Sequence, residues 1–209
     1  MNILSRWQFH ILNLLGLLNN NGALFQNLFK IYEFNNIEDE VEYIAYSISN
    51  LINSGISPYN ILAITFTNKA AKEMRSRVEL KLGNVSDSIF IGTFHSFGLR
   101  ILRENYSDIG YTSNITILDT DDTKALIKRI LKEEDLDPKN YDVKHILSRI
   151  SNAKNDGITP TEYDRLFLND EDKIIAKVYS KYLKLLKENN SVDFDDLLLK
   201  PVELFKSHP

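Results

Sequence analysis

Two continuous apolar runs constrain the fold of this 209-residue chain more than any other feature of its sequence. "ILAITF" occupies residues 61–66, and "SIFIGTF" occupies residues 88–94. Unbroken apolar runs are typical of strands buried on both faces of a parallel sheet, whereas half-exposed strands alternate apolar and polar residues. Residues 68–82 between the runs have a helical pattern that ends at Gly83. Strand, helix and strand in this order predict a parallel α/β layer.

Helices dominate the rest of the predicted structure. Residues 38–53 carry a helical apolar stripe with acidic residues in the first turn, where the helix dipole favours them. Residues 30–34 are a short strand candidate, and beyond residue 104 no strand-like run is longer than "NITILD". We therefore predict a partial α/β domain over residues 1–103 and an all-helical domain over residues 104–209. The other expected helices span residues 7–18, 121–134, 143–155, 160–167, 171–188 and 194–205.

Composition excludes several kinds of chemistry. The chain has no cysteine, so disulfides, thiolate metal sites and cysteine nucleophiles are ruled out. Residues 1–18 lack a basic segment followed by a clean apolar core, and they lack the length of a membrane span. We therefore expect a cytoplasmic protein with no membrane partner.

Positive charge gathers in one segment of a chain whose net charge is −4. Residues 60–103 contain seven Lys and Arg against three Asp and Glu. The counts are two against five in residues 1–59, and sixteen against twenty-one in residues 104–209. A local basic surface can bind phosphates on an acidic chain, because exposed charges act mainly within a Debye length of about 10 Å.

Polar side chains interleaved with aromatic ones follow both predicted strands. Ligands of open parallel sheets bind at the carboxyl ends of the strands, where hydroxyls, amides and helix-start N–H groups suit phosphate oxygens. Phenylalanines among them can stack on unpaired bases, worth roughly 1–3 kcal/mol per base. This mixture of side chains predicts a site that binds single-stranded DNA without sequence preference. The candidate residues are Thr65, Phe66, Asn68, Lys69, Thr93, Phe94 and His95.

Each of these features has a plainer interpretation. Phe66 and Phe94 would close the strand ends into the core, and Thr65 and Asn68 would be helix caps only. The lysines and arginines of residues 69–77 would be a solvated helix face. His95 has no second histidine or carboxylate at ligand spacing, so we expect no metal site. We expect no catalytic residue either.

The residues themselves resemble a known family. "NILAITFTNKAAKEMRSRV" resembles motif Ia of the UvrD/Rep/PcrA-type superfamily 1 DNA helicases, and "IGTFHSFGLRILR" resembles motif Ib. "ISNAKNDGITPTEY" and "VDFDDLLLKPVELF" are similar to the helical insert of the first motor domain and to the segment that returns towards its sheet. The resemblance covers about residues 55–209.

The resemblance implies a fold and a function. The fold is a partial RecA-like parallel sheet of the P-loop NTPase type, with strands near residues 30–34, 61–66 and 88–93. The function is part of an ATP-dependent 3′–5′ DNA helicase that uses ATP and Mg²⁺ and contacts single-stranded DNA. By motif position, Phe66 would stack on a base, while Thr65, Asn68, Thr93 and His95 would contact the DNA backbone.

The phosphate loop that this family needs is missing from its expected place. Such a loop is rich in glycine and ends in Gly-Lys-Thr or Gly-Lys-Ser, which wrap the phosphates and hold Mg²⁺. The corresponding residues 33–43, "EFNNIEDEVEY", contain no glycine, lysine, serine or threonine, and they carry five acids. The 209 residues also contain no metal-binding motif II. We therefore expect that ATP and Mg²⁺ do not bind the isolated chain and that it does not hydrolyse ATP.

The first 60 residues have two interpretations. They resemble the segment that enters the second motor domain of these helicases, which would make the chain a hybrid joined at equivalent strands. The alternative is a decayed start of the first motor domain, with Gln8 in "LSRWQ" similar to the adenine-reading glutamine.

Three hypotheses about function follow. The chain is part of a helicase, or a non-catalytic fragment that binds single-stranded DNA or a partner, or a helical scaffold without a ligand. A sheet with so few strands would expose apolar surface, so we expect marginal stability and either self-association or association with the remaining helicase domains. The sequence of the flanking DNA would separate the first two hypotheses.

Overall fold

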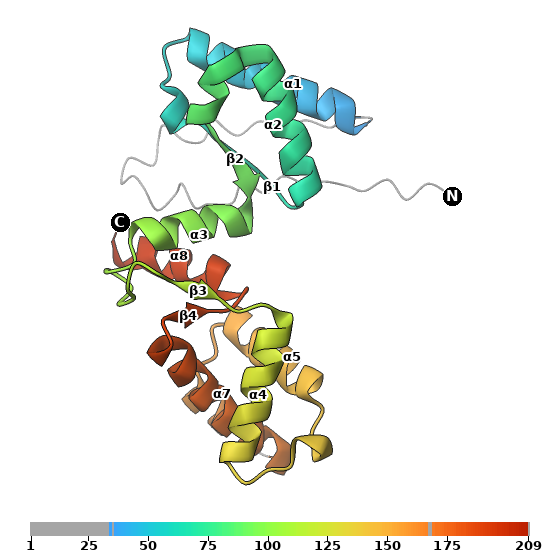
Figure 1. The fold of residues 1–209 in the computed structure, drawn as a ribbon, viewed down its shortest axis with the longest axis vertical. Coiled ribbons are helices and arrows are strands. Elements are labelled where there is room, and N and C mark those ends of the chain that lie inside the picture. The colour runs from blue at the N-terminus through green and yellow to red at the C-terminus, as the bar shows by residue number, and fades with distance from the viewer. Residues whose placement is uncertain (1–33, 35, 167–168, 209) are drawn as a thin grey trace. The chain divides into compact units, whose positions relative to one another are not determined.

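The computed structural model describes residues 34, 36–166 and 169–208, and it divides into two compact units (Figure 1). The first unit comprises the described residues up to Thr93 together with those from Phe205 on, and the second unit runs from Phe94 to Leu204. None of the helices in these described ranges has both the length and the hydropathy that crossing a bilayer requires.

The first unit contains the predicted parallel layer. Its β1 and β2 pair in parallel, with Leu62 opposite Phe90 and Thr65 opposite Thr93. The predicted strand–helix–strand order is confirmed. The elements are α1 (Ile37–Asn53), a 3₁₀ turn (Pro58–Asn60), β1 (Leu62–Thr65), α2 (Asn68–Leu82), a second 3₁₀ turn (Gly83–Ser88) and β2 (Phe90–Thr93).

Local sequence explains where these helices begin and end. The Asn36 side chain accepts a hydrogen bond from the Asp39 N–H at 2.8 Å and so caps α1. Gly83 follows α2 with φ of +57°, a conformation that costs glycine little because it has no Cβ. The apolar faces of α1 and α2 form one buried cluster with residues of both strands. The buried cluster is Val41, Ala45, Ile48, Ile61, Ala63, Met74, Val78, Ile89 and Ile91.

The second unit is mostly helical. Its main core lies between α4, α5, α6 and α7 and includes the fully buried rings of Tyr163 and Tyr182. The elements are α3 (Phe94–Glu104), β3 (Thr116–Ile117), α4 (Thr120–Glu133), a 3₁₀ turn (Pro138–Asn140), α5 (Val143–Asn155), α6 (Pro160–Leu166), α7 (Asp170–Glu188), β4 (Ser191–Val192) and α8 (Asp196–Ser207). The helices predicted beyond residue 104 are all present.

Three features of this unit were not predicted. β3 and β4 form a two-stranded parallel sheet, which adds a small strand pair to the predicted helical domain. α3 begins directly at Phe94, which we had assigned to the end of a strand, because the apolar run continues without a break into an amphipathic helix. α8 begins at Asp196 rather than at Phe194, because residues 193–195 form a turn.

Other predictions fall on residues that the structure does not describe. The helix predicted at residues 7–18 and Gln8 lie outside the described ranges. So does the strand predicted at 30–34, except for Phe34, which lies in no helix or strand. The domain boundary predicted between residues 103 and 104 stays a prediction.

A close backbone approach joins α3 and α8. Gly98 of α3 lies so near α8 that an added Cβ would come within 1.7 Å of the Leu197 carbonyl oxygen. Gly98 is therefore required by packing at a helix crossing, where any larger residue would collide with main-chain atoms.

Candidate nucleic-acid interface

The carboxyl ends of β1 and β2 bring two of the predicted residues together. Thr65 and Thr93 are the last residues of their strands and stand opposite each other in the parallel register. Each side chain is buried, with 7% of its residue surface exposed. The two threonines therefore close the end of the layer and leave little of their own surface for a ligand.

Phe66 follows β1 directly and is 59% exposed. The interpretation that this ring closes the strand end into the core is therefore wrong. The cap of α2 is Thr67, whose Oγ1 accepts a hydrogen bond from the Ala70 N–H at 3.1 Å. The interpretation of Thr65 or Asn68 as the cap is also wrong. Because Thr67 serves as the cap, Phe66 lies outside the helix, where its ring can meet a flat ligand.

Exposed polar residues follow in the first turn of α2. Asn68 and Lys69 are both exposed beside the helix N-terminus, where the backbone carries partial positive charge. Further along the helix, Arg77 pairs with Glu73, and Arg75 donates a hydrogen bond to the Ile91 carbonyl oxygen at 2.6 Å. In the described part of the chain, Lys69 and Lys72 take part in no ion pair. The basic segment is thus partly neutralised, and Lys69 and Lys72 are the available cations of α2.

Phe94 and His95 begin α3 in the second unit, and both are half-buried. The His95 ring stacks on Phe194, with ring centroids 4.1 Å apart and planes 25° from parallel. Burial lowers the pKa of His95 below its usual value, and the nearby Asp195 carboxylate opposes this effect. Burial of His95 therefore favours its neutral form.

The sequence did not identify Phe194 as a site residue. It lies in the turn between β4 and α8 and is 60% exposed. We had placed it in a helix, because β4 is only two residues long and leaves no recognisable strand pattern. The available signal was an aromatic residue flanked by aspartates in "VDFDD".

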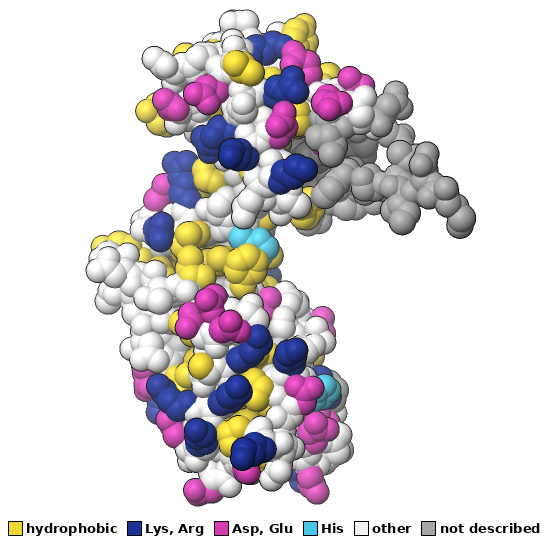
Figure 2. Space-filling model, turned by 45° about the vertical axis from the view of Figure 1, so that its right-hand side comes forward, with side chains coloured by type: hydrophobic (Ala, Val, Ile, Leu, Met, Phe, Trp, Pro, Cys, Tyr) yellow, Lys and Arg dark blue, Asp and Glu magenta, His cyan; other side chains and the backbone are white. Residues whose placement is uncertain are grey.

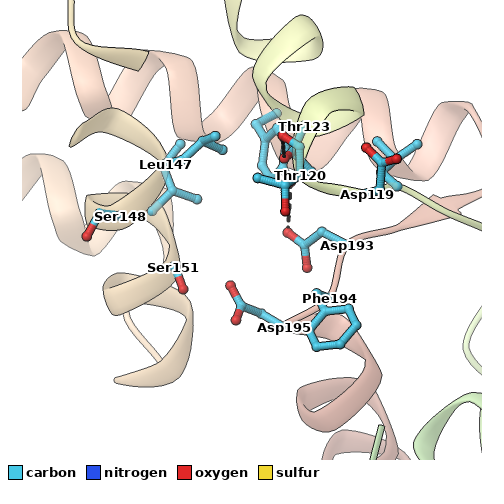
Figure 3. Close-up of a pocket in the computed structure, with 12 residues that line it drawn as sticks. Asp119, Thr120, Thr123, Leu147, Ser148, Ser151, Asp193, Phe194 and Asp195 are labelled. Carbon is cyan, nitrogen blue, oxygen red and sulfur yellow. Dashed lines mark hydrogen bonds between the residues drawn. The ribbon is translucent and has the colours of Figure 1, made fainter. Parts of the chain in front are cut away.

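A pocket of about 400 Å³ opens beside this turn. Asp193, Phe194 and Asp195 line one side, with residues from the start of α4 and from α5 around them (Figure 3). Asp119 caps α4 through the N–H groups of the two residues that follow Thr120, and Asp193 pairs with Lys154. The carboxylates of Asp119 and Asp193 thus already have partners within the walls of the pocket. The lining residues are Leu118, Asp119, Thr120, Thr123, Leu147, Ser148, Ile150, Ser151, Tyr182, Asp193, Phe194 and Asp195.

Opposite charges alternate over the surface of the helical unit (Figure 2). Ion pairs along α4 and α7 explain this pattern, among them Arg129 with Glu133 and Lys184 with Glu188. Paired surface charges contribute little net field. This surface therefore attracts phosphates less than unpaired lysines do. Nor do the described ranges hold a group of three or more His, Asp and Glu side chains arranged to bind a metal ion.

Comparison with known proteins gives the family. Residues 42–209 match the family described as the UvrD/REP helicase N-terminal domain. The chain is 49% identical over 154 residues to the ATP-dependent DNA helicase PcrA of Bacillus subtilis, which covers 74% of this chain and 21% of that protein. It is 42% identical over 168 residues to the ATP-dependent DNA helicase PcrA of Leuconostoc citreum, with 79% and 22% covered.

The described part of the chain thus combines a parallel α/β layer with a helical unit, and the chain belongs to the UvrD/REP helicase N-terminal domain family. The predicted resemblance and mixed α/β fold are confirmed. The chain spans about a fifth of the length of the relatives it matches.

Proposed function

We propose that this chain is the part of an ATP-dependent 3′–5′ DNA helicase that contacts single-stranded DNA. The observation that carries the proposal is the exposed ring of Phe66 at the carboxyl end of β1, next to the start of α2. An exposed ring beside a helix N-terminus and lysines suits a ligand with flat bases and phosphates.

Each predicted residue of the first unit has a role in this proposal. Phe66 stacks on a base, while Asn68 and Lys69 contact phosphate oxygens beside the N-terminus of α2. Thr65 and Thr93 offer the small exposed part of their surface and hold the strand ends on which Phe66 depends.

The second unit contributes a further stacking contact. His95 and Phe194 form one stacked pair, and Phe194 presents an exposed ring to a base. Phe94 is the first residue of α3, directly before His95. Stacking on aromatic rings tolerates any base, so we propose binding without sequence preference.

The start of α1 does not fit a nucleotide triphosphate. Three carboxylates occupy its first turn, at Glu38, Asp39 and Glu40. The Asn36 side chain already accepts a hydrogen bond there, from the Asp39 N–H. Carboxylates repel phosphates where a phosphate loop would need lysine and a hydroxyl. We propose that the isolated chain neither binds ATP and Mg²⁺ specifically nor hydrolyses ATP, and that both belong to the helicase as a whole.

A second candidate function is partner binding without catalysis. It rests on exposed apolar side chains in the first unit, such as Tyr59 at 78% and Leu80 at 82%. Such surface favours contact with other helicase domains or with a second copy of the chain. Sedimentation at several concentrations checks this, and a concentration-independent monomer contradicts self-association.

The proposed function is tested by anisotropy with a labelled thymidine oligonucleotide at low salt. We expect a dissociation constant of roughly 10⁻⁴–10⁻⁶ M for the whole chain. Phe66→Ala should weaken binding by roughly 1–3 kcal/mol for all bases alike. It should change the free energy of unfolding by less than about 0.5 kcal/mol, because the ring is exposed. Unchanged affinity in the folded Phe66→Ala protein overturns the role of this ring.

Lysine variants separate phosphate contacts from bystander charges. Lys69→Ala should reduce the slope of log affinity against log salt by about 0.7, the value for one phosphate contact of a single strand. Arg77→Ala is the matched control, because Arg77 already pairs with Glu73 on the same helix. Equal slopes for the two variants would contradict the assignment of Lys69.

A further inference from the structure

The turn that carries Phe194 is closed by its own hydrogen bonds. The Asp193 N–H donates to Asp196 Oδ2 at 3.3 Å, and the Asp196 N–H donates to Asp193 Oδ1 at 3.0 Å. This reciprocal pair has the form of a capping box at the start of α8. Phe194 lies between the two aspartates, so the direction of its ring depends on the shape of this turn.

A buried lysine holds the turn from a different helix. Lys154 of α5 donates to both carboxylate oxygens of Asp193, at 2.6 and 2.7 Å, and its Nζ lies 3.0 Å from Asp196 Oδ1. The three side chains are 5%, 8% and 6% exposed. The Tyr182 hydroxyl of α7 adds a hydrogen bond to Asp193 Oδ2 at 2.9 Å.

Stability alone is a poor reason for such a cluster. Burial raises the pKa of the Asp196 carboxyl, while Lys154 lowers it, so removal from water works against the charged form. Buried ion pairs are often no more stabilising than apolar residues of the same volume, and their best-attested advantage is a single defined geometry. Here the geometry defined is that of the turn between β4 and α8.

We propose that Lys154 is a positioning residue for single-stranded DNA. Through Asp193 and Asp196 it holds Phe194 against His95, so that the stacked pair is a preformed platform for a nucleobase. A preformed platform binds more tightly, because no entropy is lost in ordering the ring when DNA arrives. The inference rests on the proposed binding of single-stranded DNA by this chain, and it adds a residue that touches no DNA itself.

Two buried tyrosines of α7 provide a matched test. Tyr182→Phe removes a hydrogen bond to Asp193, whereas Tyr179→Phe removes a hydrogen bond to the Ile158 carbonyl oxygen and leaves the hydrogen bonds of the turn in place. Both variants keep the ring and lose one buried hydroxyl. We expect Tyr182→Phe to weaken binding of a thymidine oligonucleotide several-fold in the full chain and Tyr179→Phe to leave it unchanged. Equal affinities in the two variants overturn the proposal.

Lys154→Met is the stronger variant, combined with Phe194→Ala in a double-mutant cycle. Loss of one stacked base corresponds to a roughly 5- to 150-fold weaker affinity. Lys154→Met should approach this loss on its own and should cause no further loss in the Phe194→Ala background. An equal loss in both backgrounds shows a general structural role and overturns the proposal. If the Lys154→Met protein does not fold, the comparison of Tyr182→Phe with Tyr179→Phe tests the proposal instead.

A spectroscopic readout needs no DNA. The stacked Phe194 ring should shift the His95 imidazole proton resonances upfield in the NMR spectrum, with the His95→Gln variant identifying them among the four histidines. Tyr182→Phe should reduce this shift, and Tyr179→Phe should not. A changed shift without any DNA binding refutes the proposed function while the control of Phe194 by the cluster stands. DNA binding with an unchanged shift refutes the positioning role alone.

Discussion

Phe66 and Phe194 occupy similar places in two different units, yet they are held in different ways. Each follows a parallel strand closely and each is about three-fifths exposed, at 59% and 60%. Phe66 stands next to Thr67, which caps α2 by accepting a hydrogen bond from the Ala70 N–H. Phe194 is placed by a buried cluster from two further helices and by its stack on His95.

This difference shows that the exposed fraction of a ring does not tell how rigidly the protein holds that ring. A single helix cap is worth about 1 kcal/mol, so the cap beside Phe66 can open for a ligand at low cost. A buried ionic cluster loses several kcal/mol when one member is removed, so the turn of Phe194 has one geometry. We therefore expect an adaptable contact in the first unit and a rigid one in the second.

Asp193→Ala should have the largest effect on this comparison. It removes the bidentate partner of Lys154, and it leaves the lysine and the Tyr182 hydroxyl short of acceptors inside the protein. We expect the free energy of unfolding of the second unit to fall by about 3–5 kcal/mol, measured by urea denaturation. Asp195→Ala in the same turn is the control and should stay within about 0.5 kcal/mol. Similar losses of stability in both variants would show that the buried cluster does not dominate the stability of this turn.

Gly98→Ala should have the next largest effect. The new Cβ would collide with the Leu197 carbonyl of α8, so we expect a loss of about 1–3 kcal/mol. Alanine is otherwise the better helix former by about 1 kcal/mol, so a loss of stability would show that the collision outweighs this gain. Arg103→Ala in the same helix is exposed and should be nearly neutral. A more stable Gly98→Ala protein would contradict the close approach of α3 and α8.

Thr67→Ala should have the smallest effect. It removes the cap of α2, and we expect a loss of about 1 kcal/mol with faster amide exchange confined to the first turn of that helix. Asn68→Ala, one residue along, is the control for stability. A loss as large as that of Asp193→Ala would erase the distinction between an adaptable and a rigid aromatic contact.

Part of the molecule was predictable because local patterns determine it. The bounds of α2 and α5 agree with the predicted ranges, since apolar spacing, a capping threonine or aspartate and a glycine shortly after the helix end are local signals. The parallel pairing of β1 with β2 was also predictable, because continuous apolar strands separated by a helix have few other arrangements.

Elements without a local pattern were missed. β3 and β4 are two residues each, too short for any periodicity, and α3 continues the apolar run of β2 without a polar break. For the same reason Phe194 was assigned to a helix. Its strand and turn exist through pairing with a segment more than seventy residues earlier, Thr116 with Ser191.

The sequence by itself determined the family, the parallel layer and the candidate residues that follow each of its strands, because these depend on residue type and order along a short stretch. Only the tertiary structure decided which of those residues are exposed. It buried Thr65 and Thr93, exposed Phe66, and brought Lys154 onto Asp193 across 39 positions of the chain. Burial and long-range ion pairs arise from packing between distant segments, and no local pattern of residues encodes them.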